Sequence, residues 1–263
     1  MNSLKGKITF ITGASSGIGK ACAEIFAKEK SNLILSARRL DRLKTLAKKL
    51  EIVYGIKVKC IQLDVRDYDQ VKKAIDSLDN NWKKIDVLVN NAGLSRGLDK
   101  IHEGKKDDWD EMIDTNIKGL VYVTRHVLPL MVKRKKGHVI NIGSTAGHDV
   151  YPAGNVYAAT KFAVKALSQS TRYDVLDKGI KVTSVDPGMV ETEFSIVRFS
   201  GDKERAKKVY TGIKPLSAKD VAETVLFCAT RPQNVNINQV ILTPLAQASS
   251  TQIIRKEKMV KQR

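Results

Sequence analysis

The chain has 263 residues, of which 42% are hydrophobic and 28% charged, a balance typical of a globular protein rather than a disordered one. With 46 Lys and Arg against 28 Asp and Glu, the formal net charge is +18, which leaves nucleic acid, an anionic membrane surface or a phosphorylated ligand open as partners. No apolar run approaches the ~18 residues that span a bilayer, and the N-terminus lacks a signal-peptide pattern, so we expect a soluble, cytoplasmic protein.

Short apolar runs alternate with longer amphipathic segments along the whole chain. The runs predicted as strands are Ile8–Thr12, Asn32–Ala37, Lys57–Leu63, Val87–Asn90, His138–Ile142, Lys181–Asp186 and Asn238–Leu242. Helical patterns lie between them, at about 17–29, 39–54, 67–79, 107–133, 154–177 and 218–229. This alternation predicts an α/β fold, a doubly wound sheet of seven parallel strands with helices on both faces. We expect one domain over residues 1–263.

Two segments depart from this alternation. The stretch at about 188–216 is longer than a usual connection and predicts a substrate-loop insertion. The basic tail at about 249–263 has few apolar anchors (Ile253, Ile254, Met259 and Val260), and either packing on a neighbouring subunit or disorder is open. Cys22, Cys60 and Cys228 are widely spaced among apolar neighbours, which favours reduced core residues.

The first predicted strand runs into a glycine-rich turn, Thr12-Gly13-Ala14-Ser15-Ser16-Gly17-Ile18-Gly19, after which a helix begins. Glycines let the backbone turn sharply and approach a pyrophosphate, and the helix N-terminus offers free N–H groups and a partial positive charge. The position at the first strand-to-helix junction favours a dinucleotide site over a purely structural turn. The residues predicted to form it are Gly13, Ser15, Ser16, Gly17, Ile18 and Gly19.

Charge at the end of the second predicted strand indicates which dinucleotide binds. Proteins that bind NAD tend to place an acidic residue there, whereas those that bind NADP place arginine nearby. Here the strand continues into Arg38 and Arg39, with no acidic residue before Asp41. Two guanidinium groups can hold a 2′-phosphate, whereas cations opening a helix would oppose its dipole. We therefore predict NADP as the cofactor.

Tyr157 and Lys161 are spaced to lie on one face of a predicted helix. A free phenol with a pKa of ~10 is a poor base at neutral pH, and a cation within ~4–6 Å lowers that pKa. Tyr157 is therefore a candidate for proton transfer with an alcohol oxygen. The alternative for this common spacing is an amphipathic surface pair.

The chain resembles the short-chain dehydrogenase/reductase family over essentially its whole length. The TGxxxGxG spacing of the glycine turn carries the resemblance, and Asn116, Ser144, Tyr157 and Lys161 match the family's catalytic tetrad in order and spacing. The resemblance implies a single-domain Rossmann fold and an NADP-dependent oxidoreductase acting on CH–OH groups. It implies that Tyr157 exchanges a proton with the substrate oxygen and that Ser144 holds that oxygen. Lys161 would grip the nicotinamide ribose and lower the phenol pKa, while Asn116 would anchor a water.

Further motifs that follow predicted strands resemble cofactor contacts of the family. Asp64 and Val65 resemble the adenine contact, and Asn91, Ala92 and Gly93 the stretch that passes close to the cofactor. After the sixth predicted strand, Pro187, Gly188, Val190 and Thr192 resemble the stretch that fixes the nicotinamide carboxamide. All of them fall at the carboxyl ends of strands, where ligands bind in open α/β sheets.

Within the family, residues 141–147, 154–157, 192–202 and 236–238 resemble the NADP-dependent 3-hydroxy acid dehydrogenases. The resemblance implies a substrate such as L-serine, L-allo-threonine or 3-hydroxypropionate. A carboxylate substrate needs a cation, and our hypothesis is that Arg198 supplies it. Arg96 is the competing candidate. The alternative for Arg198 is a purely structural salt bridge. His148 lies between Ser144 and Tyr157 and is a weaker substrate candidate.

Three functions remain open at this point. The first is the hydroxy acid dehydrogenase, the second the same family acting on a 3-oxoacyl thioester, a sugar or a hydrophobic ketone, and the third an inactive basic binding protein. The lysines are spread along predicted helices, so we expect no nucleic-acid partner and no membrane. No histidine has metal-ligand spacing, and we predict no metal. Family members pair through helices corresponding to 107–133 and 154–177, which implies a homotetramer.

Overall fold

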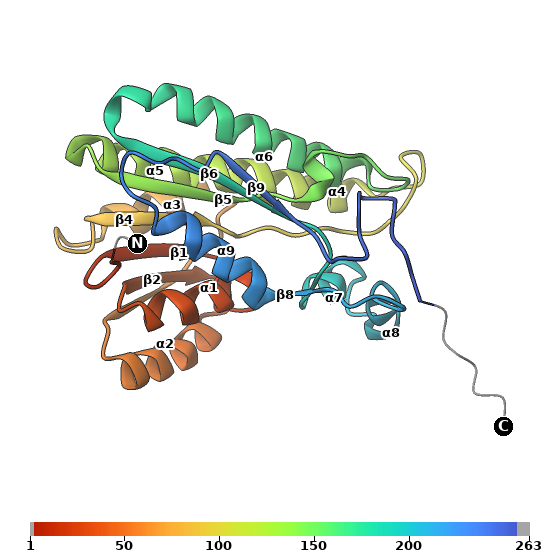
Figure 1. Cartoon of the computed structure of the whole chain (residues 1–263), viewed down its shortest axis with the longest axis horizontal. Coiled ribbons are helices and arrows are strands. Elements are labelled where there is room, and N and C mark those ends of the chain that lie inside the picture. Colours follow the sequence, from red (N-terminus) through yellow and green to blue (C-terminus); the bar gives the residue numbers. More distant parts are fainter. Residues whose placement is uncertain (1–2, 257–263) are drawn as a thin grey trace.

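A seven-stranded parallel sheet forms the centre of the computed structural model, which describes residues 3–256 (Figure 1). Its strands lie in the order β3-β2-β1-β4-β5-β6-β9. They are β1 (Ile8–Thr12), β2 (Asn32–Ala37), β3 (Val58–Gln62), β4 (Ile85–Asn90), β5 (Gly137–Ile142), β6 (Ile180–Pro187) and β9 (Gln239–Leu242). All seven predicted strands are present, and their ends differ from the prediction by two residues at most.

Helices cover both faces of this sheet (Figure 1). One layer contains α1 (Gly17–Lys28), α2 (Leu40–Tyr54) and α9 (Ala218–Ala229), and the other α3 (Tyr68–Asp76), α4 (Lys106–Ile113), α5 (Gly119–Arg134) and α6 (Asn155–Asp174). The segment predicted as one helix over 107–133 is interrupted by a π-helical turn, Asp114–Lys118, between α4 and α5. Such turns change the direction of side chains within a helix, and this one contains Asn116.

The sheet separates two hydrophobic cores. Leu33 and Leu35 of β2 are fully buried against the α1, α2 and α9 layer, whereas Ile34 between them is fully buried in the core with α3 and α5. Successive side chains of a strand point to opposite faces, so a strand covered on both sides needs apolar residues at every position. This is the physical reason for the continuous apolar runs in the sequence.

The insertion at 188–216 has more regular structure than its sequence predicts. β7 (Val190–Glu191) pairs with β8 (Leu216–Ser217) in a second, two-stranded sheet. Between them lie two short helices, α7 (Phe194–Arg198) and α8 (Lys203–Lys208). Figure 1 shows α7 and α8 beyond one end of the large sheet, apart from both helix layers.

The last described residues pack on this insertion of the same chain. The backbone N–H of Lys256 donates to the Gly212 carbonyl at 2.9 Å, and Arg255 Nη1 donates to the carbonyls of Val209 and Thr211 at 3.1 and 2.6 Å. The part of the basic tail up to residue 256 therefore packs on its own chain, and the prediction for the tail is tested only that far. Residues 257–263, with Met259 and Val260, lie outside the described part of the chain.

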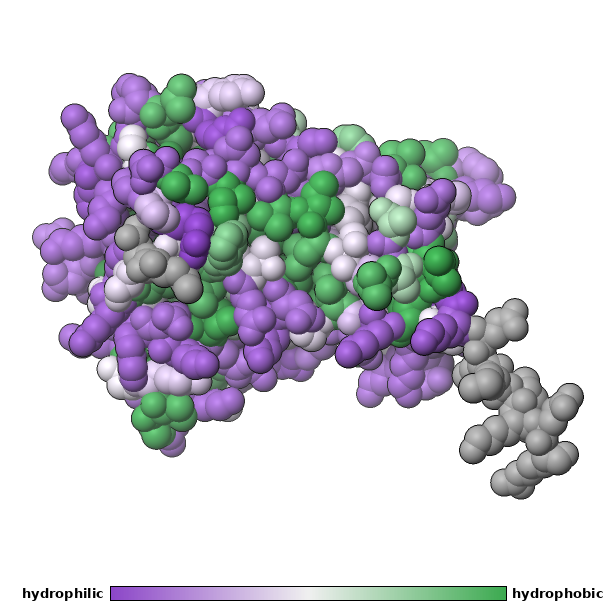
Figure 2. Space-filling model, viewed as in Figure 1, coloured by the Kyte–Doolittle hydropathy of each residue, from purple (hydrophilic) through white to green (hydrophobic). Residues whose placement is uncertain are grey.

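The surface is mainly hydrophilic, as the charge count predicts, but one face carries a hydrophobic patch over the region of α9 and β9 (Figure 2). Phe227 of α9 and Ile241 of β9 are 50% and 52% exposed. Within residues 3–256, no helix combines the length and the hydrophobicity needed to cross a membrane.

Candidate active site

A cavity of about 350 Å³ opens at the carboxyl ends of the strands. It lies where the strand order reverses between β1 and β4, the place where open α/β sheets bind ligands. The predicted residues that line it are Gly13, Ser15, Ser16, Gly17, Ile18, Arg38, Arg39, Asp64, Val65, Asn91, Ala92, Gly93, Ser144, Tyr157, Lys161, Pro187, Gly188, Val190 and Thr192. Gly19, Asn116, His148 and Arg198 are not among the lining residues.

The glycine turn has the backbone that a pyrophosphate site requires. Gly13 has a φ of +65°, a left-handed conformation that favours glycine. A Cβ at Gly19 would collide with Asn91 Nδ2, which itself donates to the Thr12 and Gly13 carbonyls at 2.9 and 3.2 Å. Ser16, the N-cap of α1, makes no side-chain cap, so the first N–H groups of the helix remain available. Gly19 therefore packs the turn rather than lining the cavity.

Arginine and serine side chains converge beside this turn, at the end of β2. Arg39 Nη2 donates to Ser16 Oγ at 2.9 Å and to Ser15 Oγ at 3.1 Å, and Arg39 Nη1 forms an ion pair with Glu193 at 3.1 Å. Arg38 is half exposed, and its nearest acidic partner, Glu111, is 3.6 Å away. Exposed guanidinium groups next to serine hydroxyls fit a 2′-phosphate. The residues present therefore suit NADP.

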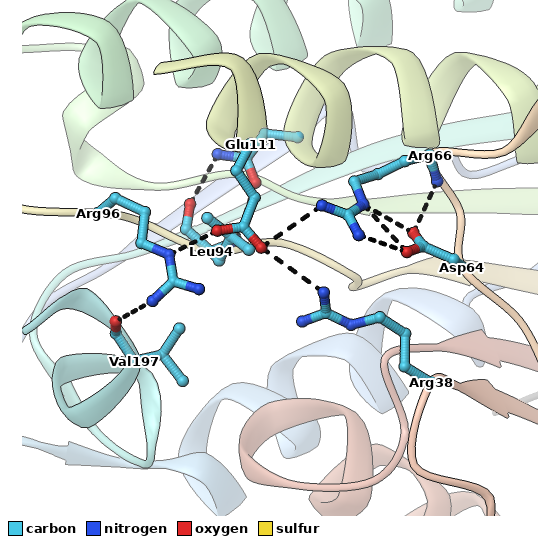
Figure 3. A network of polar contacts seen from close by, with 8 residues as sticks. Arg38, Asp64, Arg66, Leu94, Arg96, Glu111 and Val197 are labelled. Carbon is cyan, nitrogen blue, oxygen red and sulfur yellow. Dashed lines mark hydrogen bonds and ion pairs between the residues drawn. The ribbon is translucent and has the colours of Figure 1, made fainter. Parts of the chain in front are cut away.

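An ion-pair network centred on the partly buried Glu111 of α4 includes Arg38 (Figure 3). Glu111 contacts Arg96 at 2.6 Å and both Arg38 and Arg66 at 3.6 Å. Burial works to raise the pKa of Glu111, but the hydrogen bond from Arg96 and the three cations hold that pKa below its ordinary value. Glu111 is thus the shared counter-charge that keeps Arg38, Arg66 and Arg96 together.

Two residues predicted to contact a ligand, Arg96 and Asp64, are engaged in ion pairs of this network. Arg96 donates to Glu111 and, at 2.8 Å, to the carbonyl of Val197, so it supports the α7 segment rather than facing a substrate. The Asp64 carboxylate accepts hydrogen bonds from Arg66 Nε and Nη2 at 3.0 and 2.6 Å. The expected adenine acceptor at Asp64 is therefore already engaged by an arginine that sequence reasoning did not consider.

The structure brings three members of the tetrad together. Lys161 Nζ lies 5.9 Å from the centre of the Tyr157 ring and donates to the Ile142 carbonyl at 2.9 Å. Ser144, just after β5, hydrogen-bonds the Tyr157 hydroxyl. Tyr157 is 9% and Lys161 8% exposed, which excludes the alternative of a surface pair.

Asn116, the fourth member, is held apart from the cavity. Its Oδ1 accepts from the Leu94 N–H at 2.9 Å, and its Nδ2 donates to the Leu94 carbonyl at 2.8 Å and to Thr160 Oγ1 at 3.0 Å. A Cβ at Gly93 would lie 3.2 Å from Asn116 Oδ1 and 3.8 Å from Lys161 Nζ. Asn116 and Lys161 therefore approach each other across Gly93, and the water-anchoring role stays a prediction.

The ionisation of Tyr157 differs from the sequence expectation. Burial raises the pKa of Tyr157 above its ordinary value, and the counteracting influences are the charge of Arg198 and the hydrogen bond from Ser144. Lys161, expected to be the acidifying cation, is itself affected: burial lowers its pKa to about 8, against the opposing charge of Asp186. The net pKa shift of Tyr157 is opposite to the expected one, because the spacing of residues along a helix does not show how strongly a site is desolvated.

Arg198 lies over the catalytic tyrosine. Its guanidinium is 5.2 Å from the centres of both the Tyr157 and Phe194 rings, and its Nη2 donates to the Tyr151 hydroxyl at 3.3 Å. Its Nε is buried without a hydrogen-bond partner among the described residues. The alternative of a structural salt bridge is not supported, since no carboxylate pairs with Arg198 in the described part of the chain.

The remaining histidines have structural surroundings. His148 binds Asp186, a buried acidic residue that sequence reasoning missed, and its ring does not line the cavity. His138 bonds Thr183 within the sheet, and His102 lies on the surface. Residues 3–256 contain no cluster of His, Cys, Asp and Glu that could hold a metal ion.

A parallel sheet whose glycine turn shares one cavity with Ser144 and the buried pair Tyr157 and Lys161 defines an oxidoreductase of the Rossmann class. Residues 7–203 match the family model described as short chain dehydrogenase. The chain belongs to this family, and both the predicted family and the predicted fold are confirmed.

Three proteins with at least 42% identity to this chain are named as dehydrogenases of 3-hydroxy acids or of serine. The chain is 44% identical over 258 residues to the NADP-dependent 3-hydroxy acid dehydrogenase of Schizosaccharomyces pombe, covering 98% of this chain and 100% of that protein. A protein of the same function name from Salmonella typhi is 46% identical over 92% of this chain and 96% of its own length. The closed form of serine dehydrogenase complexed with NADP+ superposes with a TM-score of 0.88 at 42% identity, over 95% of this chain and 100% of that one.

Proposed function

We propose that this chain is an NADP-dependent oxidoreductase that acts on the hydroxyl-bearing carbon of a small 3-hydroxy acid, such as L-serine, L-allo-threonine or 3-hydroxypropionate. The observation that carries the proposal is the position of Arg198, whose guanidinium lies 5.2 Å from the ring of Tyr157. A substrate whose hydroxyl meets Tyr157 would present a group two carbons away to that cation. The names of the relatives support the same substrate class.

Each residue of the site has a chemical role in this proposal. Tyr157 takes the proton from the substrate oxygen during oxidation and returns it during reduction. Ser144 donates a hydrogen bond that holds the same oxygen, and Lys161, with its ammonium beside the ring, stabilises the phenolate and positions the ribose. NADP supplies the acceptor or donor of the hydride.

The cofactor contacts follow from the lining of the cavity. The N–H groups at the start of α1 bind the pyrophosphate, and Arg38, Arg39 and Ser15 bind the 2′-phosphate. Val190 and Thr192 also line the cavity, and in this proposal they fix the nicotinamide carboxamide. His148 has no place in the substrate contacts, because its ring is bound to Asp186.

The decisive experiment compares charged and uncharged substrates. NADP+ reduction is measured with L-serine, L-allo-threonine and 3-hydroxypropionate, beside 1-propanol, simple ketones and acetoacetyl thioesters in the appropriate direction. Arg198→Met removes a charge that lowers the pKa of Tyr157, so kcat should fall for every substrate. KM should rise at least ten-fold for the hydroxy acids alone, since a charge-assisted hydrogen bond contributes ~1.5–3 kcal/mol.

A matched control is available in the same insertion. Arg205 carries the same charge, but it is exposed and stacks on the Phe199 ring at 4.3 Å, whereas Arg198 lies over Tyr157. Arg205→Met should leave all substrates unchanged. If Arg198→Met raises KM for hydroxy acids no more than for uncharged alcohols, or if the thioesters or ketones are the better substrates, the 3-hydroxy acid proposal is wrong.

The assembly proposed here is a homotetramer in the cytoplasm. Exposed apolar side chains of α5 and α6, such as Val121 and Phe162, and the patch formed by Phe227 and Ile241, provide two separate surfaces for pairing. Three free cysteines agree with a reducing compartment. Light scattering coupled to size-exclusion chromatography should give four times the chain mass of 29.2 kDa, and cell fractionation tests the location.

A further inference from the structure

One buried carboxylate near the active site has no part in the mechanism above. Asp186, near the end of β6, is 1% exposed. Its Oδ2 accepts from His148 Nε2 at 2.7 Å and from Gln239 Nε2 at 2.5 Å, and its Oδ1 accepts from Ser184 Oγ. A carboxylate enters a protein interior at high cost unless such donors surround it.

We propose that Asp186 is a positioning residue for hydride transfer, which fixes the turn carrying Ser144 and supplies the counter-charge for the buried Lys161 ammonium. The proposal rests only on the use of Ser144 and Lys161 as catalytic residues. It holds for any alcohol or carbonyl substrate of the site.

The turn that carries Ser144 is attached to Asp186 at both of its ends. At the first end, Gly143 packs directly on the carboxylate, because a Cβ at Gly143 would collide with Asp186 Oδ1. The Gly143 N–H also donates to the carbonyl of Val185 at 2.8 Å. At the second end, His148 closes the 3-10 turn Thr145–Gly147 and donates to Asp186. Ser144 therefore lies on a short arc whose two ends contact one carboxylate.

Lys161 is linked to the same place. Its Nζ donates to the carbonyl of Ile142, the residue before Gly143, at 2.9 Å. Burial lowers the pKa of Lys161, and among the acidic groups Asp186 is the one that raises it. Replacing the carboxylate with a neutral group would therefore favour the uncharged amine, which can neither stabilise a phenolate nor donate three hydrogen bonds.

Several charged and titratable groups face Asp186 and Lys161. They are His148 after the 3-10 turn, Tyr157 and Lys165 on α6, and Arg198 on α7, with Ser184 of β6 and Gln239 of β9 as neutral donors. Lys165 Nζ lies 3.4 Å from His148 Nδ1, so the imidazole proton is on Nε2, where it donates to Asp186. Within this group Asp186 is the single carboxylate, and its charge has no substitute.

The experiment measures kcat against pH from 6 to 10 for wild type, Asp186→Asn and Asp186→Glu, at saturating NADP+ and with the best substrate found for the wild type. In Asp186→Asn we expect kcat to fall at least ten-fold and the alkaline limb of the profile, where Lys161 loses its proton, to move down by about one pH unit. Asp186→Glu retains the charge and should retain the wild-type position of that limb, even if its kcat is lower.

A second variant and a control separate the turn from the charge. His148→Leu has no donor for Asp186, so it removes one attachment of the turn and keeps the carboxylate, and kcat should fall at least three-fold with no shift of the alkaline limb. Asp149→Asn removes the neighbouring exposed carboxylate, which accepts from the Ser250 N–H at 3.3 Å, and should match the wild type in both respects.

Each possible outcome either supports or overturns the proposal. An Asp186→Asn enzyme with the wild-type rate and limb overturns it, as does an Asp186→Glu enzyme whose limb shifts as far as that of Asp186→Asn. If Asp186→Asn does not fold, Asp186→Glu and His148→Leu decide, and an unchanged kcat in His148→Leu shows that Asp186 does not act by fixing the turn. Failure of the proposed function is distinguishable, since it shows as a lack of hydroxy acid turnover in the wild type itself.

Discussion

The two halves of the site are held in different ways. The glycine turn and the residues after β4 and β5 are fixed by backbone hydrogen bonds and by packing so close that a single Cβ does not fit at Gly19 or Gly143. The α7 segment is instead held by side chains: Glu193 pairs with Arg39 and Arg42, Arg96 holds the Val197 carbonyl, and Arg198 stacks on aromatic rings.

The tightly packed half carries the proposed reacting groups, and the α7 half carries the proposed substrate-binding residue Arg198. Proton transfer tolerates little displacement of the reacting groups, so it is placed on elements that cannot move independently. Ion pairs between exposed side chains, such as those of Glu193, are weaker, and they can rearrange when a ligand binds. The comparison therefore predicts large, local effects from the first half and small, salt-dependent effects from the second.

The largest effect should come from Tyr157→Phe. Removing the hydroxyl leaves the ring contacts with Phe194 and Arg198 intact, so the fold and NADP binding should persist. Because the proton carrier is lost, kcat should fall by ~10²–10⁴-fold. Steady-state kinetics and NADPH fluorescence measure the two properties. Wild-type turnover in this variant would remove the assignment of Tyr157 as the acid–base group.

Gly19→Ala should come next and should affect the cofactor. The new methyl group would push against Asn91 and the Gly13 carbonyl, which overpacks the turn and costs ~1–3 kcal/mol of unfolding free energy. NADP should bind at least ten-fold more weakly, as measured by titration. Gly6→Ala is the control: Gly6 also has a positive φ, of +73°, but nothing lies within 4 Å of its Cβ position, so only stability should change. Equal NADP affinity in the two variants would contradict the close fit.

The smallest effect should come from Glu193→Gln in the second half. Glu193 contacts Arg39 and Arg42 at 3.1 and 2.8 Å, and all three side chains are 42–50% exposed. The free energy of unfolding should change by less than ~1 kcal/mol, and the difference should shrink in high salt. Limited proteolysis should nevertheless cut the 193–216 region several-fold faster.

The control for this local loosening is Glu191→Gln. Glu191 lies two residues earlier on β7, is exposed, and forms no ion pair within the described residues. Its proteolysis rate should equal that of the wild type. Equal rates in both variants would show that the ion pairs of Glu193 do not hold the segment.

The sequence by itself determined the sheet, the cofactor turn and the pairing of Tyr157 with Lys161, because each depends on short-range pattern. Continuous apolar runs define doubly covered strands, glycines define the turn, and an i, i+4 spacing places Tyr157 beside Lys161. Only the tertiary structure decided the rest, because burial and charge act between residues far apart in the chain. It brought Asp186 to His148 and Arg198 to Tyr157, and it engaged Asp64 with Arg66. Desolvation, which no pattern of residue types measures, reversed the expected shift in the pKa of Tyr157.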